Sequence, residues 1–157
     1  MICDLSEQIR TELVESLARI GQRPTPQREH VFRVLLSQRD HPTADEVYAR
    51  AKIDMPTISL ATVYNCLESL TACGLVRPVN IERESSRYCP NLSEHAHFHC
   101  RKTGRVYDIE IPQGLMQSLK KLLPQDCTAE DVQLAFHGVK ASDNETVHRP
   151  QIHFHLS

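Results

Sequence analysis

The chain has 157 residues, of which 40% are hydrophobic and 24% charged, a composition that suits one ordinary globular domain or two small ones. It shows no apolar run near the ~18 residues of a membrane span and no secretory signal at residues 1–4, so we expect a cytoplasmic protein without a membrane partner. The net charge of −2 gives no general reason to expect nucleic acid, but residues 19–39 hold five arginines against one glutamate, a local excess that suits a small DNA-binding element.

Four helices are predicted in the first half of the chain. Apolar residues at helical spacing indicate the first over residues 5–20, and a glycine follows it. The second, over 25–36, begins with a threonine and a proline, and the third, over 43–51, opens with the capping box Thr-Ala-Asp-Glu. The fourth covers 59–73, with a serine cap before it and a glycine after it. Four such helices with short connections predict a compact bundle.

Two short strands joined by a charged turn are predicted next, over residues 75–81 and 86–89. Helices followed by a hairpin are typical of a winged helix-turn-helix, in which residues 59–73 would be the recognition helix in the major groove of DNA. Polar residues on such a helix often face only solvent, but the basic second helix and the hairpin favour DNA contact. The candidate contacts are Ser59, Thr62, Tyr64 and Asn65.

The last third of the chain predicts a small second domain. Strands are expected over residues 95–100 and 105–111, then a helix over 115–123 and a strand over 131–139. A unit this small has only one good face to bury, so we expect it to complete its core against a second copy. A symmetric homodimer would also pair its recognition helices with palindromic DNA.

The predicted fold class is therefore α+β, with an N-terminal winged helix-turn-helix followed by a small α/β dimerisation domain. We expect the DNA-binding domain to cover residues 1–89. A hinge is expected at 90–94, and the dimerisation and metal-binding domain at 95–157.

Histidines at every second position from His95 to His99 are the strongest indication of chemistry. In a strand all three rings project from one face. Cys89 lies six residues before this run, and Asp108 follows in the next strand. Imidazole, thiolate and carboxylate are ligands of a borderline to soft divalent ion, usually zinc. The alternative is that some of these histidines only decorate an exposed sheet face, but His95 and His97 with Cys89 and Asp108 in one short meander favour metal ligation.

Five short segments carry distinctive motifs: GQRPTPQR at 21–28, HPTA at 41–44, ISLATVY at 58–64, GLV at 74–76 and the pattern His95-x-His97-x-x-Cys100. Together they closely resemble the ferric uptake regulator family of metal-dependent bacterial repressors, over roughly residues 19–139. The resemblance implies a dimer whose winged-helix domains close on DNA when metal binds at the domain joint. It implies that Tyr64 and its neighbours meet bases and that Arg23 approaches the minor groove. The implied regulatory site consists of His41, Cys89, His95, His97 and Asp108.

The chain departs from the family pattern at the usual structural zinc, which two Cys-x-x-Cys pairs hold. Here only Cys100 is present, because the other three positions are Thr103, Lys140 and Asp143, so we predict that the structural zinc site is absent. A further auxiliary site is not expected either, since its positions hold Glu94, Ala96, Leu115 and Asp131. Three tail histidines could supply a replacement site together with His99 or Cys100, or could lie on an exposed polar strand: His148, His153 and His155.

The residue at position 89 bears on the choice of metal. Zinc-responsive members of the family often carry a cysteine there, whereas the iron- and peroxide-responsive branches carry a carboxylate, and a thiolate favours zinc. We therefore expect a repressor with one regulatory Zn²⁺ site per protomer, controlling metal uptake from a palindromic, A·T-rich operator. An iron- or peroxide-responsive regulator using Fe²⁺ or Mn²⁺ is the alternative within the family.

Two alternatives from other classes remain. Histidine, thiolate and carboxylate ligands with an open position also describe a catalytic zinc site, so a metalloenzyme is conceivable. No His-Glu-x-x-His pair occurs in the sequence, however, and no glutamate is plainly placed as a general base, so we do not expect an enzyme. A metal-free winged-helix protein that uses its second domain only to dimerise is the other alternative.

Overall fold

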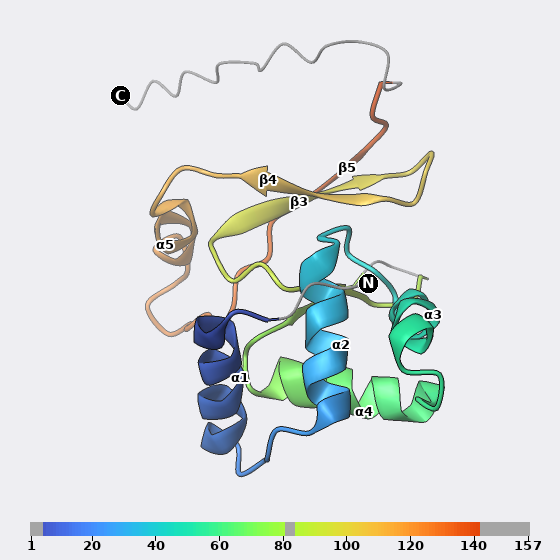
Figure 1. Ribbon diagram of the computed structural model, residues 1–157. Coiled ribbons are helices and arrows are strands. Elements are labelled where there is room, and N and C mark those ends of the chain that lie inside the picture. Colours follow the sequence, from blue (N-terminus) through green and yellow to red (C-terminus); the bar gives the residue numbers. More distant parts are fainter. Residues whose placement is uncertain (1–4, 81–83, 142–157) are drawn as a thin grey trace.

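The computed structural model describes residues 5–80 and 84–141. Four helices and a hairpin occupy its first half, and a three-stranded sheet with one short helix occupies its second half (Figure 1). The predicted α+β class is confirmed. None of the helices in the described part of the chain is long and apolar enough to cross a lipid bilayer.

The first four helices each begin at a residue whose hydroxyl accepts a hydrogen bond from a backbone N–H of the first turn. The predicted capping box is present. The Thr43 hydroxyl accepts from the backbone of Glu46 at 3.3 Å, and the Glu46 carboxylate accepts from the backbone of Thr43 at 2.8 Å. The helices are α1 (Glu7–Arg19), α2 (Pro26–Ser37), α3 (Ala44–Asp54) and α4 (Leu60–Ala72).

These four helices enclose one apolar core. Leu75 and Val76 belong to this core because the chain turns back after α4, where both of their N–H groups donate to the carbonyl of Leu70. The first predicted strand is therefore shorter than expected. The core fixes α4 from one side and leaves the other side in solvent. Its fully buried residues include Leu13, Leu17, Val31, Leu35, Val47, Val63, Leu67 and Leu70.

A two-stranded antiparallel hairpin follows, formed by β1 (Arg77–Val79) and β2 (Arg87–Cys89). The hairpin is attached to the connection between α2 and α3, since the N–H of Tyr88 donates to the carbonyl of Pro42 at 3.0 Å. Thr43 and Arg87 form an isolated antiparallel bridge at the same place. This attachment brings the end of β2 close to the residues that precede α3.

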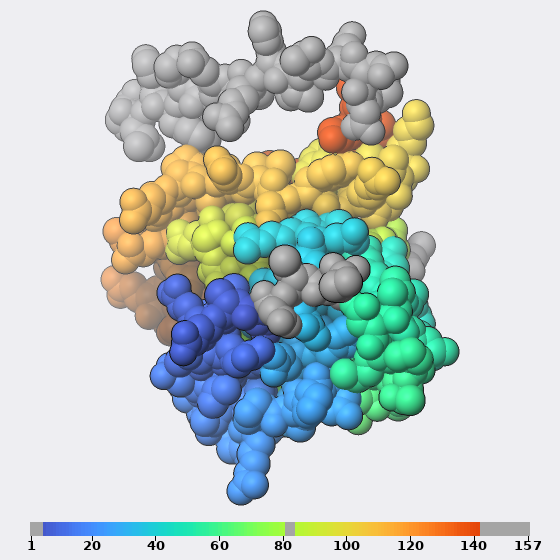
Figure 2. Space-filling model, in the orientation of Figure 1, coloured from blue at the N-terminus to red at the C-terminus, as the bar shows by residue number. Residues whose placement is uncertain are grey.

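The second half of the chain is built on β3 (His95–Cys100), which lies between the antiparallel β4 (Val106–Glu110) and the parallel β5 (Ala135–Gly138). The short helix α5 (Leu115–Lys120) lies between β4 and β5 in the sequence. Both α5 and β5 are shorter than the 115–123 and 131–139 expected. For β5 the reason is that its pairing with β3 starts only at Ala135. The sheet lies across one end of the helical part, as the yellow and orange surface in Figure 2 shows.

Candidate metal centre

Five side chains that can bind a metal converge where the helical part meets the sheet. They come from separate segments: the α2–α3 connection, the end of β2, two positions of β3 and the middle of β4. One ligand atom from each lies within 4.8 Å of the corresponding atom of every other member. We call this group the interdomain cluster. It contains all five residues of the implied regulatory site: His41, Cys89, His95, His97 and Asp108.

Strand register explains much of the convergence. His97 on β3 is paired with Asp108 on β4, and side chains at paired positions share a face of the sheet. His95 lies two residues from His97, so its ring projects from that face too. The hairpin attachment brings Cys89 beside them, with its Sγ 3.5 Å from the Nε2 of His95.

One oxygen of Asp108 is at the centre of the interdomain cluster. Its Oδ1 atom lies 2.8 Å from the Nε2 of His41, 3.3 Å from that of His95 and 3.7 Å from that of His97. The Nε2 atoms of His95 and His97 are 3.0 Å apart. Several electron-rich atoms thus face one small volume, which is the donor arrangement that a divalent ion requires.

Two neighbouring groups hold the ligands in orientation. The carbonyl of Ser93 accepts a hydrogen bond from the Nδ1 of His95 at 2.7 Å, which leaves the lone pair of that ring on Nε2, facing the interdomain cluster. The side-chain amide of Asn91 donates to the second oxygen of Asp108 at 2.8 Å. The sequence did not reveal either role, although both residues lie within the predicted hinge at 90–94.

The charges within the interdomain cluster are strongly coupled. Burial lowers the pKa of His41, but Asp108 and Cys89, which both face its ring, outweigh burial and raise that pKa to about 9. Burial and the nearby rings of His95 and His41 lower the pKa of His97 to about 4. Burial raises the pKa of Asp108, but His41 and Asn91 hold it well below its usual range. At neutral pH and without metal, the ring of His41 is therefore positively charged, Asp108 is ionised and His97 is neutral.

His41 has the most constrained position of the five. Its φ is +55°, the only positive φ of a non-glycine residue in the described part of the chain, and Pro42 follows it. Both ring nitrogens are buried without a well-aligned hydrogen bond, even though Nε2 lies close to Asp108. Buried polar atoms normally find a partner. A bound cation would supply one, so the residues present fit a metal ion.

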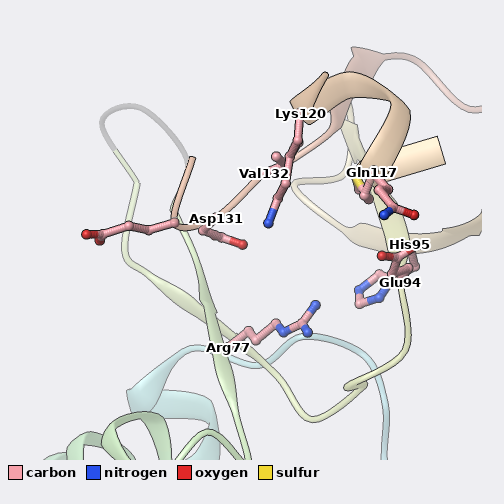
Figure 3. A pocket seen from close by; sticks show the side chains of 9 residues that line it. Arg77, Glu94, His95, Gln117, Lys120, Asp131 and Val132 are labelled. Carbon is pink, nitrogen blue, oxygen red and sulfur yellow. The ribbon is translucent and has the colours of Figure 1, made fainter. Parts of the chain in front are cut away.

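A cavity of about 540 Å³ opens beside His95 (Figure 3). Arg77 and Lys120 point into it, and Glu94 and Asp131 line its wall. Among the described residues, the interdomain cluster is the only group of three or more His, Cys, Asp or Glu side chains close enough to hold an ion. His95 is the only member of the cluster that lines the cavity, and the cavity is not a second three-ligand site.

The candidate DNA contacts lie away from the interdomain cluster. Tyr64 is 47% exposed on α4, and Asn65 beside it is exposed as well. The hydroxyls of Ser59 and Thr62 lie 2.8 Å from each other, and Ser59 also caps the helix. Arg23 is exposed in the loop before α2.

Arg28 links that loop to the predicted recognition helix. Its guanidinium donates to the carbonyl of Arg23 at 2.7 Å and to the hydroxyl of Ser69 on α4 at 3.3 Å. The loop and α4 are therefore held in one arrangement.

The remaining histidines singled out in the sequence are His99 and the three histidines of the tail. His99 shares the alternation of His95 and His97 but lies outside the interdomain cluster, and its ring stacks on that of His137. The tail histidines, for which a replacement metal site was considered, lie outside the described residues: His148, His153 and His155.

The fold and the site together define a two-part α+β protein with nitrogen, sulfur and oxygen ligands gathered at the joint between its parts. Residues 19–140 match the Ferric uptake regulator family, and the chain belongs to that family. It is a metal-responsive transcriptional regulator of this class. This membership gives no support to the metalloenzyme alternative.

Individual relatives show how the family varies. The chain is 41% identical over 110 residues to the peroxide-responsive repressor PerR of Staphylococcus aureus, a match that spans 68% of this chain and 74% of that protein. The structure is similar to that of the Campylobacter jejuni peroxide stress regulator, with 25% identity, a TM-score of 0.65 and coverage of 90% and 99% of the two chains. It is also similar to a zinc-bound manganese uptake regulator, with 27% identity, a TM-score of 0.62 and coverage of 83% and 99%.

Proposed function

We propose that this chain is a zinc-responsive repressor that binds a palindromic, A·T-rich DNA operator as a homodimer when one zinc ion per protomer occupies the interdomain cluster. The observation that carries the proposal is the origin of the ligands. His41 and Cys89 belong to the half with the helices and the hairpin, whereas His95, His97 and Asp108 belong to the sheet. An ion held by all five fixes one half against the other.

Cys89 supports zinc over harder ions. Its side chain is almost fully buried, and its Sγ faces both His95 and Asp108. A thiolate in an otherwise nitrogen and oxygen ligand set shifts preference towards zinc. The similarity to PerR, a peroxide-responsive repressor by name, favours a second candidate, an iron- or manganese-dependent peroxide sensor with the same interdomain cluster.

In the proposed mechanism the residues of the interdomain cluster act by closing the joint. When bound, the ion supplies an attractive centre for ligands that otherwise repel one another or hold a proton. Asn91 and Ser93 keep Asp108 and His95 oriented, so the sheet presents a prepared half-site to His41 and Cys89. Moving a two-state equilibrium from 1:99 to 99:1 needs about 5.5 kcal/mol of differential binding. Zinc-site binding energies are of order 10 kcal/mol, so the two ligands that the helical half adds on closing, His41 and Cys89, can supply that difference.

The homodimer rests on apolar surface left exposed by a single chain. Several large apolar side chains of the second half face solvent in the single chain. They offer a surface that a second copy could bury and would set the spacing of the two copies of α4. These residues are Ile109, Leu122, Leu123, Phe136 and Val139.

The test of the function is metal-dependent DNA binding. We expect DNA selected from a random pool with the zinc-loaded protein to be palindromic and A·T-rich, and to be released when a chelator removes the zinc. Restoring zinc should restore the complex. Equal affinity with and without chelator would contradict the proposal and favour a metal-free winged-helix protein. Tight binding with manganese or ferrous iron but not with zinc would favour the second candidate.

Two DNA-contact variants should fail in different ways. Arg23→Ala is expected to weaken binding to operator and random DNA alike and to reduce the salt dependence by about one phosphate contact, because it removes an exposed cation. Tyr64→Ala should mainly reduce discrimination between the two DNAs, by about 1–3 kcal/mol, since it removes a base-facing side chain. Glu68→Ala, at another exposed position of α4, is the matched control. Equal losses on both DNAs for Tyr64→Ala would show that α4 is not the recognition helix.

Zinc binding should depend on pH through His41. Its pKa of about 9 means that below this pH an incoming ion must displace the ring proton. This one group is therefore expected to raise zinc affinity about tenfold per pH unit between pH ~7 and ~9, and to release about one proton per ion at pH ~7. Calorimetry in buffers of different ionisation enthalpy counts the protons. His41→Gln should release about one proton fewer than wild type, and an unchanged count would show that His41 is not a ligand.

A further inference from the structure

The two members of the interdomain cluster that come from the helical half, His41 and Cys89, are joined by the side chain of Arg87. Arg87 lies on β2 two positions before Cys89, and its guanidinium donates a hydrogen bond to the backbone carbonyl of His41 at 3.0 Å. The backbones also meet here, because Arg87 forms an antiparallel bridge with Thr43. One residue therefore connects the backbone of one ligand to the strand that carries the other.

The guanidinium of Arg87 is in turn held by α3. Its Nη1 lies 3.3 Å from a carboxylate oxygen of Glu46, and the same oxygen accepts the capping hydrogen bond from the backbone of Thr43. The Arg87 side chain is only 17% exposed, so these contacts and not solvent surround it. The arginine thus fixes β2, the α2–α3 connection and the first turn of α3 in one arrangement.

The contact with His41 falls where the backbone is strained. His41 has a φ of +55°, and a non-glycine residue keeps such a value only when its surroundings fix it. Its carbonyl belongs to the planar peptide bond with Pro42, so a hydrogen bond to that oxygen fixes the plane of the bond and with it the ψ of His41. Because the side chain projects from the same backbone, this contact also sets the direction in which the imidazole points.

The charge of Arg87 is unfavourable for binding a cation. A guanidinium that contacts His41 repels a positive ion bound by the ring of the same residue. Burial adds a cost, because the Nε of Arg87 is buried without a hydrogen-bond partner in the described part of the chain. Any benefit that Arg87 brings to the site therefore comes from its hydrogen bonds and not from its charge.

We propose that Arg87 is a positioning residue that sets the backbone of His41 and holds it beside Cys89, so that the helical half presents both ligands to the ion as one preformed unit. The assignment rests on the proposed function of the interdomain cluster. It complements the hydrogen bonds that orient the ligands of the sheet half. An ion that meets two ligands already in place loses less affinity to ordering them.

Zinc affinity of the full-length protein, measured without DNA by competition with a chelator, tests the assignment. Arg87→Met removes the donors and the charge, and should weaken zinc binding by about 10-fold or more, as loss of a group that orients ligands usually does. If Arg87 acted only through its charge, the same change would strengthen zinc binding. Arg39→Met is the matched control. It removes the same charge two residues before His41, from an exposed side chain without a hydrogen-bond partner among the described residues, and should not weaken zinc binding.

Histidine ring resonances, observed by NMR, distinguish positioning from a general loss of stability. In Arg87→Met, one equivalent of zinc should still shift the rings of His95 and His97, while the shift of the His41 ring should be largely lost. Wild-type zinc affinity in this variant, or an equal loss at all three rings, would overturn the assignment and leave the proposed function standing. A wild-type protein that binds no zinc would overturn both.

Two milder substitutions complete the test. Arg87→Lys keeps a cationic donor and should recover part of the zinc affinity lost in Arg87→Met, so equal affinities of these two variants would refute the assignment. Glu46→Gln removes the charge that holds the guanidinium, while its amide oxygen can still complete the cap of α3. It should weaken zinc binding by a smaller factor. If Arg87→Met does not fold, Glu46→Gln replaces it, and wild-type zinc affinity in that variant then overturns the assignment.

Discussion

His97→Ala is expected to abolish zinc-dependent DNA binding while the helical part stays folded. His97 belongs to the sheet, and its Nε2 faces both His95 and Asp108 at the joint. Without this ligand the sheet no longer presents a half-site that holds the ion at the joint, so zinc cannot shift the population towards the closed arrangement. Operator affinity should then fall to that for random DNA, typically ~10³-fold or more. Fluorescence anisotropy with labelled operator and buffered zinc measures the loss.

Two further variants test whether the effect of His97→Ala is specific to the interdomain cluster. Asn91→Ala leaves all five members of the cluster in place but removes the hydrogen bond that orients Asp108, together with the two that the Asn91 side chain accepts from Ser93. It should weaken the zinc response by about 10–100-fold. Lys102→Ala changes an exposed residue of the β3–β4 connection and serves as the control. A wild-type zinc response in His97→Ala would show that the five side chains converge for a reason other than metal.

Substitution of Cys89 is expected to change which metal ion best supports DNA binding. Cys89→Ser removes the thiolate and should weaken the zinc response by at least ~10-fold, whereas Cys89→Asp replaces it with a carboxylate and should shift preference towards manganese or ferrous iron. The aspartate variant should keep metal-dependent DNA binding, since the ligand count is preserved. The measurement is operator affinity with zinc, manganese and anaerobic ferrous iron for all three proteins. Identical metal rankings would remove Cys89 from the site and with it the reason for choosing zinc.

Local patterns were sufficient to predict the helices and four of the five members of the interdomain cluster. Capping residues and apolar spacing locate α1 to α4 because these signals act within a few residues. The alternation from His95 to His97 predicts a shared face because a strand has a period of two. The contribution of His41, by contrast, came only from the family resemblance. No local pattern connects it to residues more than fifty positions later.

The remaining features depend on contacts that the sequence does not encode locally. The first predicted strand is short because Leu75 and Val76 are bound to the end of α4 and buried in the helical core. His99 follows the same alternation as His97 but stacks on His137, because its partner on β5 is a histidine and its partner on β4 is the apolar Val106. Ser93 and Asn91 lie in an irregular segment, so only the three-dimensional structure shows that they orient ligands.

The left-handed backbone conformation of His41 affects how readily the protein would release a bound metal ion. Such a conformation costs a non-glycine residue about 1–2 kcal/mol, and the proline after it adds a further restriction. We expect separation of the two halves to relieve this strain, so the strain opposes retention of the ion and weakens its affinity by about tenfold for each 1.4 kcal/mol. A regulator that held zinc as firmly as a structural site would stay on DNA long after the supply had fallen. In the proposed zinc-responsive repressor, the strained residue would therefore favour release of the ion when the supply falls.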